Sequence, residues 1–348
     1  GTLVVKTVAR NAVRIQYGED GHSLPEKLPD WTYVKNDEVD DCNLRVEVNS
    51  KHQLLKIKDR KGRVVFTATR HDMEGEQATL AFASPRGEYL YGLGQFQDGQ
   101  VNVRGLSRRL TQVNTQIALP MLLSSKGYGI LWNNYGMTEY NPCSRSVSMT
   151  KRGGEGIREE VNVTSTEGGK KEVRERHVFE ASLNIDKEGD YAVLLDVGQK
   201  MARRHQLTID GKVVFDLTNL WLPPTMSEIV RLKKGHHQVT AELTKDDKPV
   251  LYYNKVEDET VFRSPVAEKV DYTVFVGSPD EVIATYRELT GKCPKMPSWA
   301  LGYIHCRERF NSSDDILQAA NRFKREHIPV DMLKLRSEER RVGKECRS

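Results

Sequence analysis

The sequence lacks the long apolar run that a membrane-spanning helix requires. None of its hydrophobic stretches approaches the ~20 consecutive apolar residues of a bilayer-crossing helix. The first residues, GTLVVKTVARNAVRIQYG, also lack the basic-then-apolar layout of a signal peptide and instead alternate as a strand does. Because the chain begins with Gly1 and not Met, these residues say nothing of a signal further upstream. The sequence predicts no membrane span and a strand near its start.

Cysteine is sparse, and its spacing matches neither a disulfide framework nor a thiolate metal site. No CxxC occurs, and the five cysteines are far apart: Cys42, Cys143, Cys293, Cys306 and Cys346. Such scatter is typical of free thiols. His236 and His237 are adjacent, which favours a surface pair beside a turn over a metal site. We therefore expect no metal and no cofactor.

An excess of one charge sign is missing as well. Lys and Arg number 53 against 49 Asp and Glu, the net charge is +4, and the charges are interspersed. A nucleic-acid-binding protein needs a basic stripe or patch, which is absent. The 38% hydrophobic and 29% charged content is that of a globular protein, and 348 residues allow two or three domains.

The common catalytic templates are also absent. The sequence contains no GxSxG, no HExxH and no GxxxxGK[ST]. The stretch YGLGQ has two glycines but lacks the third glycine and the following helix of a dinucleotide-binding loop, so we interpret it as a turn between strands.

What the sequence does contain is strand patterning over two long regions. Residues 1 to about 150 carry strand–turn–strand segments such as LLKIKDRKGRVVFTATR, GYGILWNNYG and ATLAFAS, which favours a sandwich of many strands. Residues 151–175 are glycine-rich and charged, and predict a surface connection. A second β unit follows from about Phe179 to Lys255, with a hairpin turn at Asp210-Gly211.

The pattern changes after residue 277. SPDEVIATYRELTGK predicts a helix with Ser278 as N-cap, Glu281 completing a capping box and Gly291 at the end. MPSWALGYIHC predicts a strand buried on both faces, SSDDILQAANRFKREHIP a second helix, and VDMLKL another strand. Strand, helix and strand in this order predict a parallel sheet, of which one such unit is only the beginning.

The last residues differ from the rest of the chain. RSEERRVGKECRS, residues 336–348, has neither helical nor strand periodicity. It resembles the in-frame translation of a common short-read sequencing adapter, although a charged solvated end is the alternative. We expect 336–348 to be an artefact and the chain to be an N-terminal fragment that stops near Leu335.

Two stretches contain the candidate site residues. RGLSRRLTQVNTQIALP (104–120) gathers amide, hydroxyl and guanidinium groups before an apolar strand, which suits sugar hydroxyls. A plain surface loop is the alternative. YIHCRERFN (303–311) places polar and aromatic residues at the carboxyl end of the first parallel strand, where β/α barrels build their sites. The alternative there is an Arg–Glu pair that caps the strand.

These stretches and their order resemble a known family. GEYLYGLGQFQDGQVNVRG, TQVNTQIALPMLLSSKGYGILWNNYG, FRSPVAEKVDYTVFVGSPDEVIATYRELTGK and MPSWALGYIHCRERFNSSDDILQAANRFKREHIPVDML together resemble the front part of glycoside hydrolase family 31. More narrowly, they are similar to its bacterial xyloglucan-degrading α-xylosidases. The resemblance covers the chain from about residue 1 to Leu335.

The resemblance implies a mainly β fold class. It predicts an N-terminal, galactose-mutarotase-like β-sandwich with an inserted β-sandwich domain of protective-antigen type, followed by the first βαβ unit of a truncated (β/α)₈ barrel. The implied boundaries are 1–155 and 256–278 for the sandwich, 175–255 for the insert, 279–295 for a linker helix and 296–335 for the start of the barrel.

The resemblance also implies a retaining mechanism that uses two carboxylic acids on later barrel strands. No position of this chain matches either, so we expect no catalytic residue and no activity in residues 1–348. Asn114, with Gln112 and Thr115, matches the sandwich loop that contacts sugar, and Arg307 and Phe310 match the end of the first barrel strand. Trp221 is a candidate for stacking on a sugar ring, although a buried core position is the alternative.

The implied function is that of an exo-acting α-xylosidase on xyloglucan oligosaccharides, with an α-glucosidase of the same family as the near alternative. A non-catalytic carbohydrate-binding protein and a structural surface protein remain open, although the βαβ pattern argues against the former. The expected partner is an oligosaccharide, with no nucleic acid, and the oligomeric state is left open. The expected localisation is periplasmic or secreted.

Overall fold

The computed structural model describes most of the chain in two compact units. The described residues are 1–18, 39–49, 54–113, 115–134, 136–165, 168–198, 202–244, 248–307, 310 and 312–335. Residues 336–348, which resemble an adapter translation, lie outside them. One unit comprises Gly1–Arg158 and Glu175–Gly291, and the other comprises Glu159–Arg174 and the chain from Lys292 onward.

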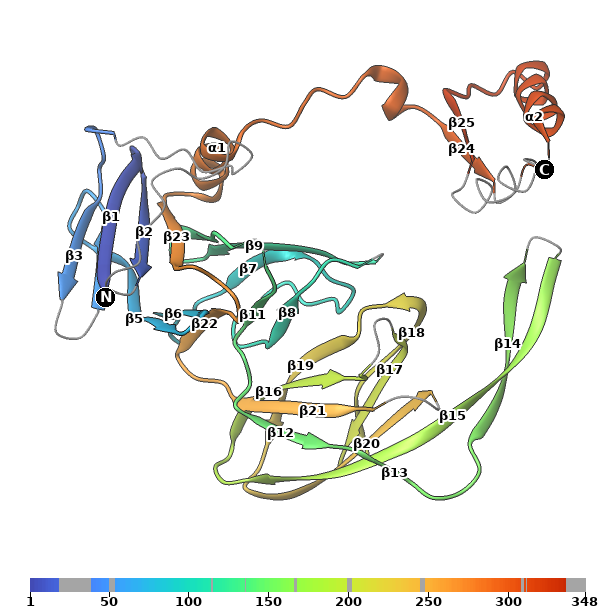
Figure 1. Ribbon diagram of the computed structural model, residues 1–348, viewed down its shortest axis with the longest axis horizontal. Helices are drawn as coiled ribbons and strands as arrows, with labels where there is room; N and C mark the ends of the chain where they lie inside the picture. The colour runs from blue at the N-terminus through green and yellow to red at the C-terminus, as the bar shows by residue number, and fades with distance from the viewer. Residues whose placement is uncertain are drawn as a thin grey trace. The chain divides into compact units, whose positions relative to one another are not determined.

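The first unit begins with a sandwich of two antiparallel sheets (Figure 1). One sheet has the order β1 (Thr2–Ala9), β2 (Ala12–Gly18), β23 (Val270–Val276), β10 (Tyr128–Trp132), β9 (Ile117–Ser124) and β7 (Leu90–Gln95). The other has the order β3 (Arg45–Asn49), β4 (Leu54–Lys58), β5 (Val64–Glu74), β6 (Gln77–Ala83), β22 (Glu259–Ser264), β11 (Thr138–Tyr140) and β8 (Arg108–Leu110). Strands β22 and β23 therefore return to complete both sheets.

The core of this sandwich is filled by large aromatic side chains. The ring of Trp132 stacks on Phe262 with centroids 5.9 Å apart and an interplanar angle of 5°. Phe82 and Tyr140 also contact Phe262, and all four side chains are fully buried. These rings come from strands of both sheets, so apolar burial holds the two layers together.

A second pair of sheets is inserted between β11 and β22, and Figure 1 shows its strands in green to orange. The smaller sheet has the order β12 (Arg145–Ser148), β21 (Val250–Lys255), β16 (Gly189–Asp196) and β19 (Thr225–Leu232). The larger has the order β13 (Thr150–Lys151), β15 (Gly168–Ile185), β20 (Gly235–Thr244), β17 (Ala202–Ile209) and β18 (Lys212–Leu222), with β14 (Ile157–Ser165) paired to β15. The inserted pair of sheets has its own apolar core.

The inserted sheets confirm one local prediction and correct another. Asp210 and Gly211 have φ of 50° and 75°, as the Asp-Gly hairpin turn between β17 and β18 requires. Residues 151–175, predicted as a surface connection, instead contribute to β14 and β15. Because residues 171–173 of β15 are exposed, this stretch needs no apolar alternation, and its strand character was not visible in the sequence.

Helix α1 (Pro279–Thr290) closes the first unit and confirms the predicted capping box. The Ser278 hydroxyl accepts from the Glu281 N–H at 3.4 Å, and the Glu281 carboxylate accepts from the Ser278 N–H at 2.8 Å. Val282 and Leu289 are buried against the sheet that contains β10 and β23. The helix therefore forms a second apolar cluster with this sheet, separate from the core between the two sheets.

The part of the second unit from Lys292 onward contains one parallel strand pair among its described residues. This part comprises the 3₁₀ helix η1 (Ser298–Leu301), β24 (Ile304–Arg307), α2 (Ser313–Arg325) and β25 (Met332–Leu335), and Ile304 pairs with Met332 in parallel. The parallel unit is thus confirmed, but the predicted strand is shorter, because Ser298–Leu301 forms one 3₁₀ turn after Pro297. Among the described residues, no helix has the length and apolarity needed to cross a membrane.

Apolar side chains of the second unit are unusually exposed. Trp299, Leu301 and Leu317 are 48%, 79% and 59% exposed, and α2 has no buried residue. Exposed apolar surface of this kind promotes association.

We expect a chain shortened to 1–291 to remain monomeric at concentrations where 1–348 aggregates, because the shorter chain lacks this surface. A chain shortened to 1–278 also lacks α1, which uncovers Phe275 and Met121 on the sheet beneath the helix, and it should be less stable than 1–291. Light scattering after size-exclusion chromatography measures both effects. Equal aggregation of 1–291 and 1–348 would refute this expectation.

Candidate functional site

Two of the three predicted sandwich residues lie in the loop between β8 and β9. Gln112 is exposed and Thr115 is partly buried, while Asn114 lies outside the described residues. Val113 and Gln116 exchange backbone hydrogen bonds of 3.3 and 3.2 Å, which hold these two residues of the loop together. The structure therefore brings Gln112 and Thr115 together on one short, polar loop.

Amide side chains hold this loop in place. Gln116 is buried, and its amide nitrogen donates to the carbonyl of Thr111 at 2.9 Å. The amide of Gln97 donates to the carbonyl of Thr115 at 3.3 Å, and the side-chain oxygen of Gln112 accepts from the Ala118 N–H at 3.4 Å. A loop held in this way can present polar groups to a ligand at little ordering cost.

A pocket of about 370 Å³ opens beside the loop. Its lining residues come from β8, β9, β10, β11, the loops between them and α1: Leu110, Gln112, Ala118, Leu119, Pro120, Leu131, Trp132, Asn133, Asn134, Gly136, Thr138, Tyr286 and Thr290. The volume is within the ~300–1,000 Å³ typical of ligand pockets, and apolar walls with a few amides are the usual lining.

The described lining of the pocket can bind a ligand but holds no carboxylate, imidazole, thiol or amine for acid–base or nucleophilic chemistry. Its lining contains no Asp, Glu, His, Cys or Lys. The amide of Asn133 donates to the Asp271 carboxylate at 3.1 Å, and the side-chain oxygen of Asn134 accepts from the Gly136 N–H at 2.8 Å. These fixed amides suit an uncharged, hydroxyl-rich molecule.

Two arginines precede the loop, and both are paired with carboxylates. Burial lowers the pKa of the Arg108 guanidinium, and the Asp98 carboxylate opposes this effect. Burial acts in the same direction on Arg109, but the hydrogen bond and charge of Asp196 outweigh it and raise the pKa of Arg109. Each arginine is positively charged and is paired with a carboxylate, so the base of the loop is not an anion site.

The other predicted residues belong to the second unit. Arg307 ends β24, and its side chain is outside what the structure describes. Phe310 is buried, with its ring centroid 6.4 Å from that of His305. His305 also packs 4.9 Å from Phe323 of α2, and its Nδ1 lies 3.0 Å from the Tyr303 hydroxyl. Phe310 therefore belongs to an aromatic cluster at the end of β24.

The pocket amides and the supporting glutamines were not predicted from the sequence. Asn133 and Asn134 follow the apolar strand GILW directly, and two adjacent amides at a strand end were the available signal. Nothing local marks Gln97, which reaches the loop across 18 residues. Trp221 lies in β18, and its side chain is not described. In the described residues, no three His, Cys, Asp or Glu side chains are grouped for a metal.

Similarity to a solved structure identifies the class of this fold. A GH31 α-xylosidase from Xanthomonas citri matches 96% of this chain and 43% of its own with a TM-score of 0.71 at 22% identity. The chain thus has the fold of the β-rich N-terminal part of family 31 glycoside hydrolases, as the resemblance predicted. No family model matches the sequence.

Curated relatives agree with this class. An α-xylosidase of Saccharolobus solfataricus is 25% identical over 309 residues, which is 84% of this chain. An α-glucosidase 2 of Bacillus thermoamyloliquefaciens is 34% identical over 89 residues, or 25% of this chain. The similarity to family 31 α-xylosidases and α-glucosidases is therefore confirmed. The chain spans 27% of the first relative and 11% of the second.

Proposed function

We propose that this chain is the N-terminal part of a retaining, exo-acting α-glycosidase, and specifically of an α-xylosidase that acts on xyloglucan oligosaccharides. One observation carries the proposal: a relative named α-xylosidase is similar over most of the chain, in which two β-sandwiches lead into a parallel strand–helix–strand unit. An extracytoplasmic location is part of the proposal and rests on the family resemblance alone.

In this proposal the chain supplies binding groups, and the reaction depends on residues outside it. Double displacement needs a carboxylate nucleophile and a carboxylic acid that protonates the leaving oxygen and then activates water. We assign neither role to residues 1–348, because no position of the sequence matches either motif of the family, and the described lining of the pocket beside Gln112 contains no carboxylate. Gln112 and Thr115 are proposed to contact substrate hydroxyls, and Arg307 and Phe310 to lie near the substrate at the first barrel strand.

The α-glucosidase alternative has a specific observation in its favour, the similarity of one segment to a protein named α-glucosidase 2. The two substrates differ by one hydroxymethyl group. A pocket that is closed to this group discriminates by about 10–200-fold, the range found for single small groups.

The proposal is tested by expressing the longer protein and comparing kcat/KM on aryl α-D-xyloside and aryl α-D-glucoside. We expect the xyloside to be preferred by about 10–200-fold, and proton NMR to detect α-xylose as the first-formed anomer. Residues 1–348 alone should show no turnover and serve as the matched blank. Preference for the glucoside would favour the alternative, and first formation of the β-anomer or no hydrolysis of either substrate would refute the proposal.

A further inference from the structure

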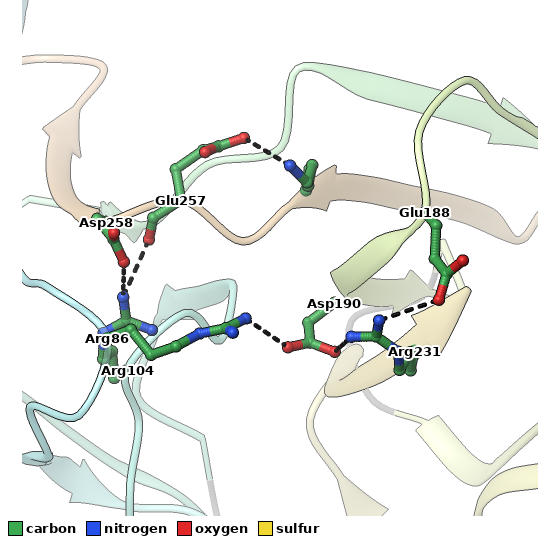
Figure 2. Close-up of polar contacts among 8 residues, drawn as sticks. Arg86, Arg104, Glu188, Asp190, Arg231, Glu257 and Asp258 are labelled. Atoms are coloured by element: carbon green, nitrogen blue, oxygen red, sulfur yellow. Dashed lines mark hydrogen bonds and ion pairs between the residues drawn. The ribbon is translucent and has the colours of Figure 1, made fainter. Parts of the chain in front are cut away.

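Strand β16 of the inserted sheets has one aspartate near its start and another at its end, and each contacts an arginine of the first sandwich. At its start, Asp190 lies 3.6 Å from Arg86 of the sandwich and 3.4 Å from Arg231 of β19, which also pairs with Glu188 at 3.0 Å (Figure 2). The Arg86 side chain is 83% exposed, and ion pairs this exposed contribute little. The Asp190 end is therefore a weak junction.

The chain that returns from the insert is fixed near the same end. The Arg104 guanidinium donates to the Asp258 carboxylate at 2.6 Å (Figure 2). It also donates to the Ser84 carbonyl at 2.8 Å. The Val256 N–H donates to the Asp190 carbonyl at 2.8 Å. Backbone contacts therefore remain here even when the Asp190 carboxylate is removed.

The other end of β16 makes a more buried contact. Asp196 is hydrogen-bonded to the guanidinium of Arg109, and the two side chains are 18% and 26% exposed. The guanidinium also lies 5.0 Å from the centroid of the Tyr252 ring of β21. Arg109 is thus enclosed by two strands of the insert, although it belongs to β8 of the sandwich.

Neighbouring contacts extend this junction along the sandwich. The Arg108 guanidinium pairs with Asp98 at 2.5 Å and lies 4.1 Å from the Phe96 ring centroid. The amide of Gln100 donates to the Glu228 carboxylate at 2.6 Å. The remaining crevice has a volume of about 20 Å³, room for roughly one water. A space of this size is a packed junction and not a ligand pocket.

Strand β8 needs this support because it is short and lies at a sheet edge. It has three residues, and its only neighbour in the described sheet is β11. The loop with Gln112 and Thr115 begins directly after it. An edge strand held on one side opens more readily than a central one.

We propose that the inserted domain positions the described residues of the loop after β8, Gln112 and Thr115 among them, with Asp196 acting through Arg109 as the positioning residue. The insert thereby holds in place the polar groups that border the pocket, although it contributes none of the pocket's lining. The expected effect on substrate binding rests on the proposed function, whereas the positioning of the loop does not.

Hydrogen–deuterium exchange on the whole chain tests the positioning, with Asp196→Asn as the test and Asp190→Asn as the matched control. Both replacements are isosteric and lie on the same strand, and the asparagine at 196 can still accept from the Gly198 N–H. We expect exchange in the peptide 108–118 to be about tenfold faster with D196N and within about twofold of wild type with D190N. A tenfold change corresponds to a loss of about 1.4 kcal/mol in the free energy of local opening. Peptides of β10 and β17 should not change in either variant.

Arg109→Lys is the second variant, because it keeps the positive charge but loses the planar donor pair. It should also speed exchange in the peptide 108–118. Unchanged exchange there in both D196N and R109K overturns the proposal, and so does an equal acceleration in the β10 and β17 peptides, which indicates general destabilisation. In the longer glycosidase, D196N should raise KM several-fold with kcat nearly unchanged. Faster loop exchange with unchanged KM would support the positioning and refute the substrate role of the loop.

Discussion

Replacement of Asp271 by alanine should lower the free energy of unfolding of the first unit by about 3–5 kcal/mol, the cost of leaving one member of a buried ion pair without its partner. Asp271 and Arg14 are 2% and 1% exposed. The carboxylate accepts from the Arg14 guanidinium at 2.9 and 2.5 Å, from the Gln16 amide at 3.0 Å and from the Asn133 amide at 3.1 Å. Removal of the carboxylate leaves the charged Arg14 guanidinium buried without this acceptor.

The matched control is Asp186→Ala, which also removes an aspartate paired with an arginine. That pair is 2.7 Å long, but its side chains are 46% and 64% exposed, so the expected cost is at most about 1 kcal/mol. Urea unfolding of 1–291, followed by circular dichroism, measures both. Similar midpoints for the two variants would contradict a structural role for the Arg14–Asp271 pair.

Replacement of Trp132 by alanine should cost a similar 3–5 kcal/mol, as do large-to-small changes of buried aromatic residues. The indole is fully buried, stacks on Phe262, and donates from its Nε1 to the Ser264 hydroxyl at 3.0 Å. Its loss opens a cavity between the two sheets of the sandwich and leaves one face of Phe262 without its stacked partner.

Trp299→Ala is the control for this prediction, because Trp299 is 48% exposed and its loss should change stability by no more than about 0.5 kcal/mol. Both variants are compared in 1–348, at a concentration below that at which it aggregates, by circular dichroism during urea unfolding. A Trp132→Ala protein with the wild-type midpoint would show that the aromatic stack does not hold the layers together.

Features determined by neighbouring residues could be predicted from the sequence. The Asp210-Gly211 hairpin, the capping box of α1 and the parallel pair β24–β25 each depend on short-range patterns, and all three were found. The 3₁₀ turn at Ser298–Leu301 was not, since an apolar run does not distinguish a strand from a turn.

Contacts between distant segments could not be predicted. Arg14 and Asp271 are 257 positions apart, and Arg109 and Asp196 are 87 apart, so nothing in the sequence pairs them. The same holds for the site. The loop with Gln112 was found from its composition, whereas the pocket depends on how β9, β10 and α1 come together.

The proposed function is tested most simply by sequencing the source DNA across codon 335 with a different library chemistry. We expect an open frame that continues after Leu335 into further strand–helix units, with an acidic residue soon after β25 and two catalytic carboxylic acids on later strands. A genomic RSEERRVGKECRS followed by a stop codon would contradict this expectation, and sugar binding by the two β-sandwiches would then be the leading hypothesis.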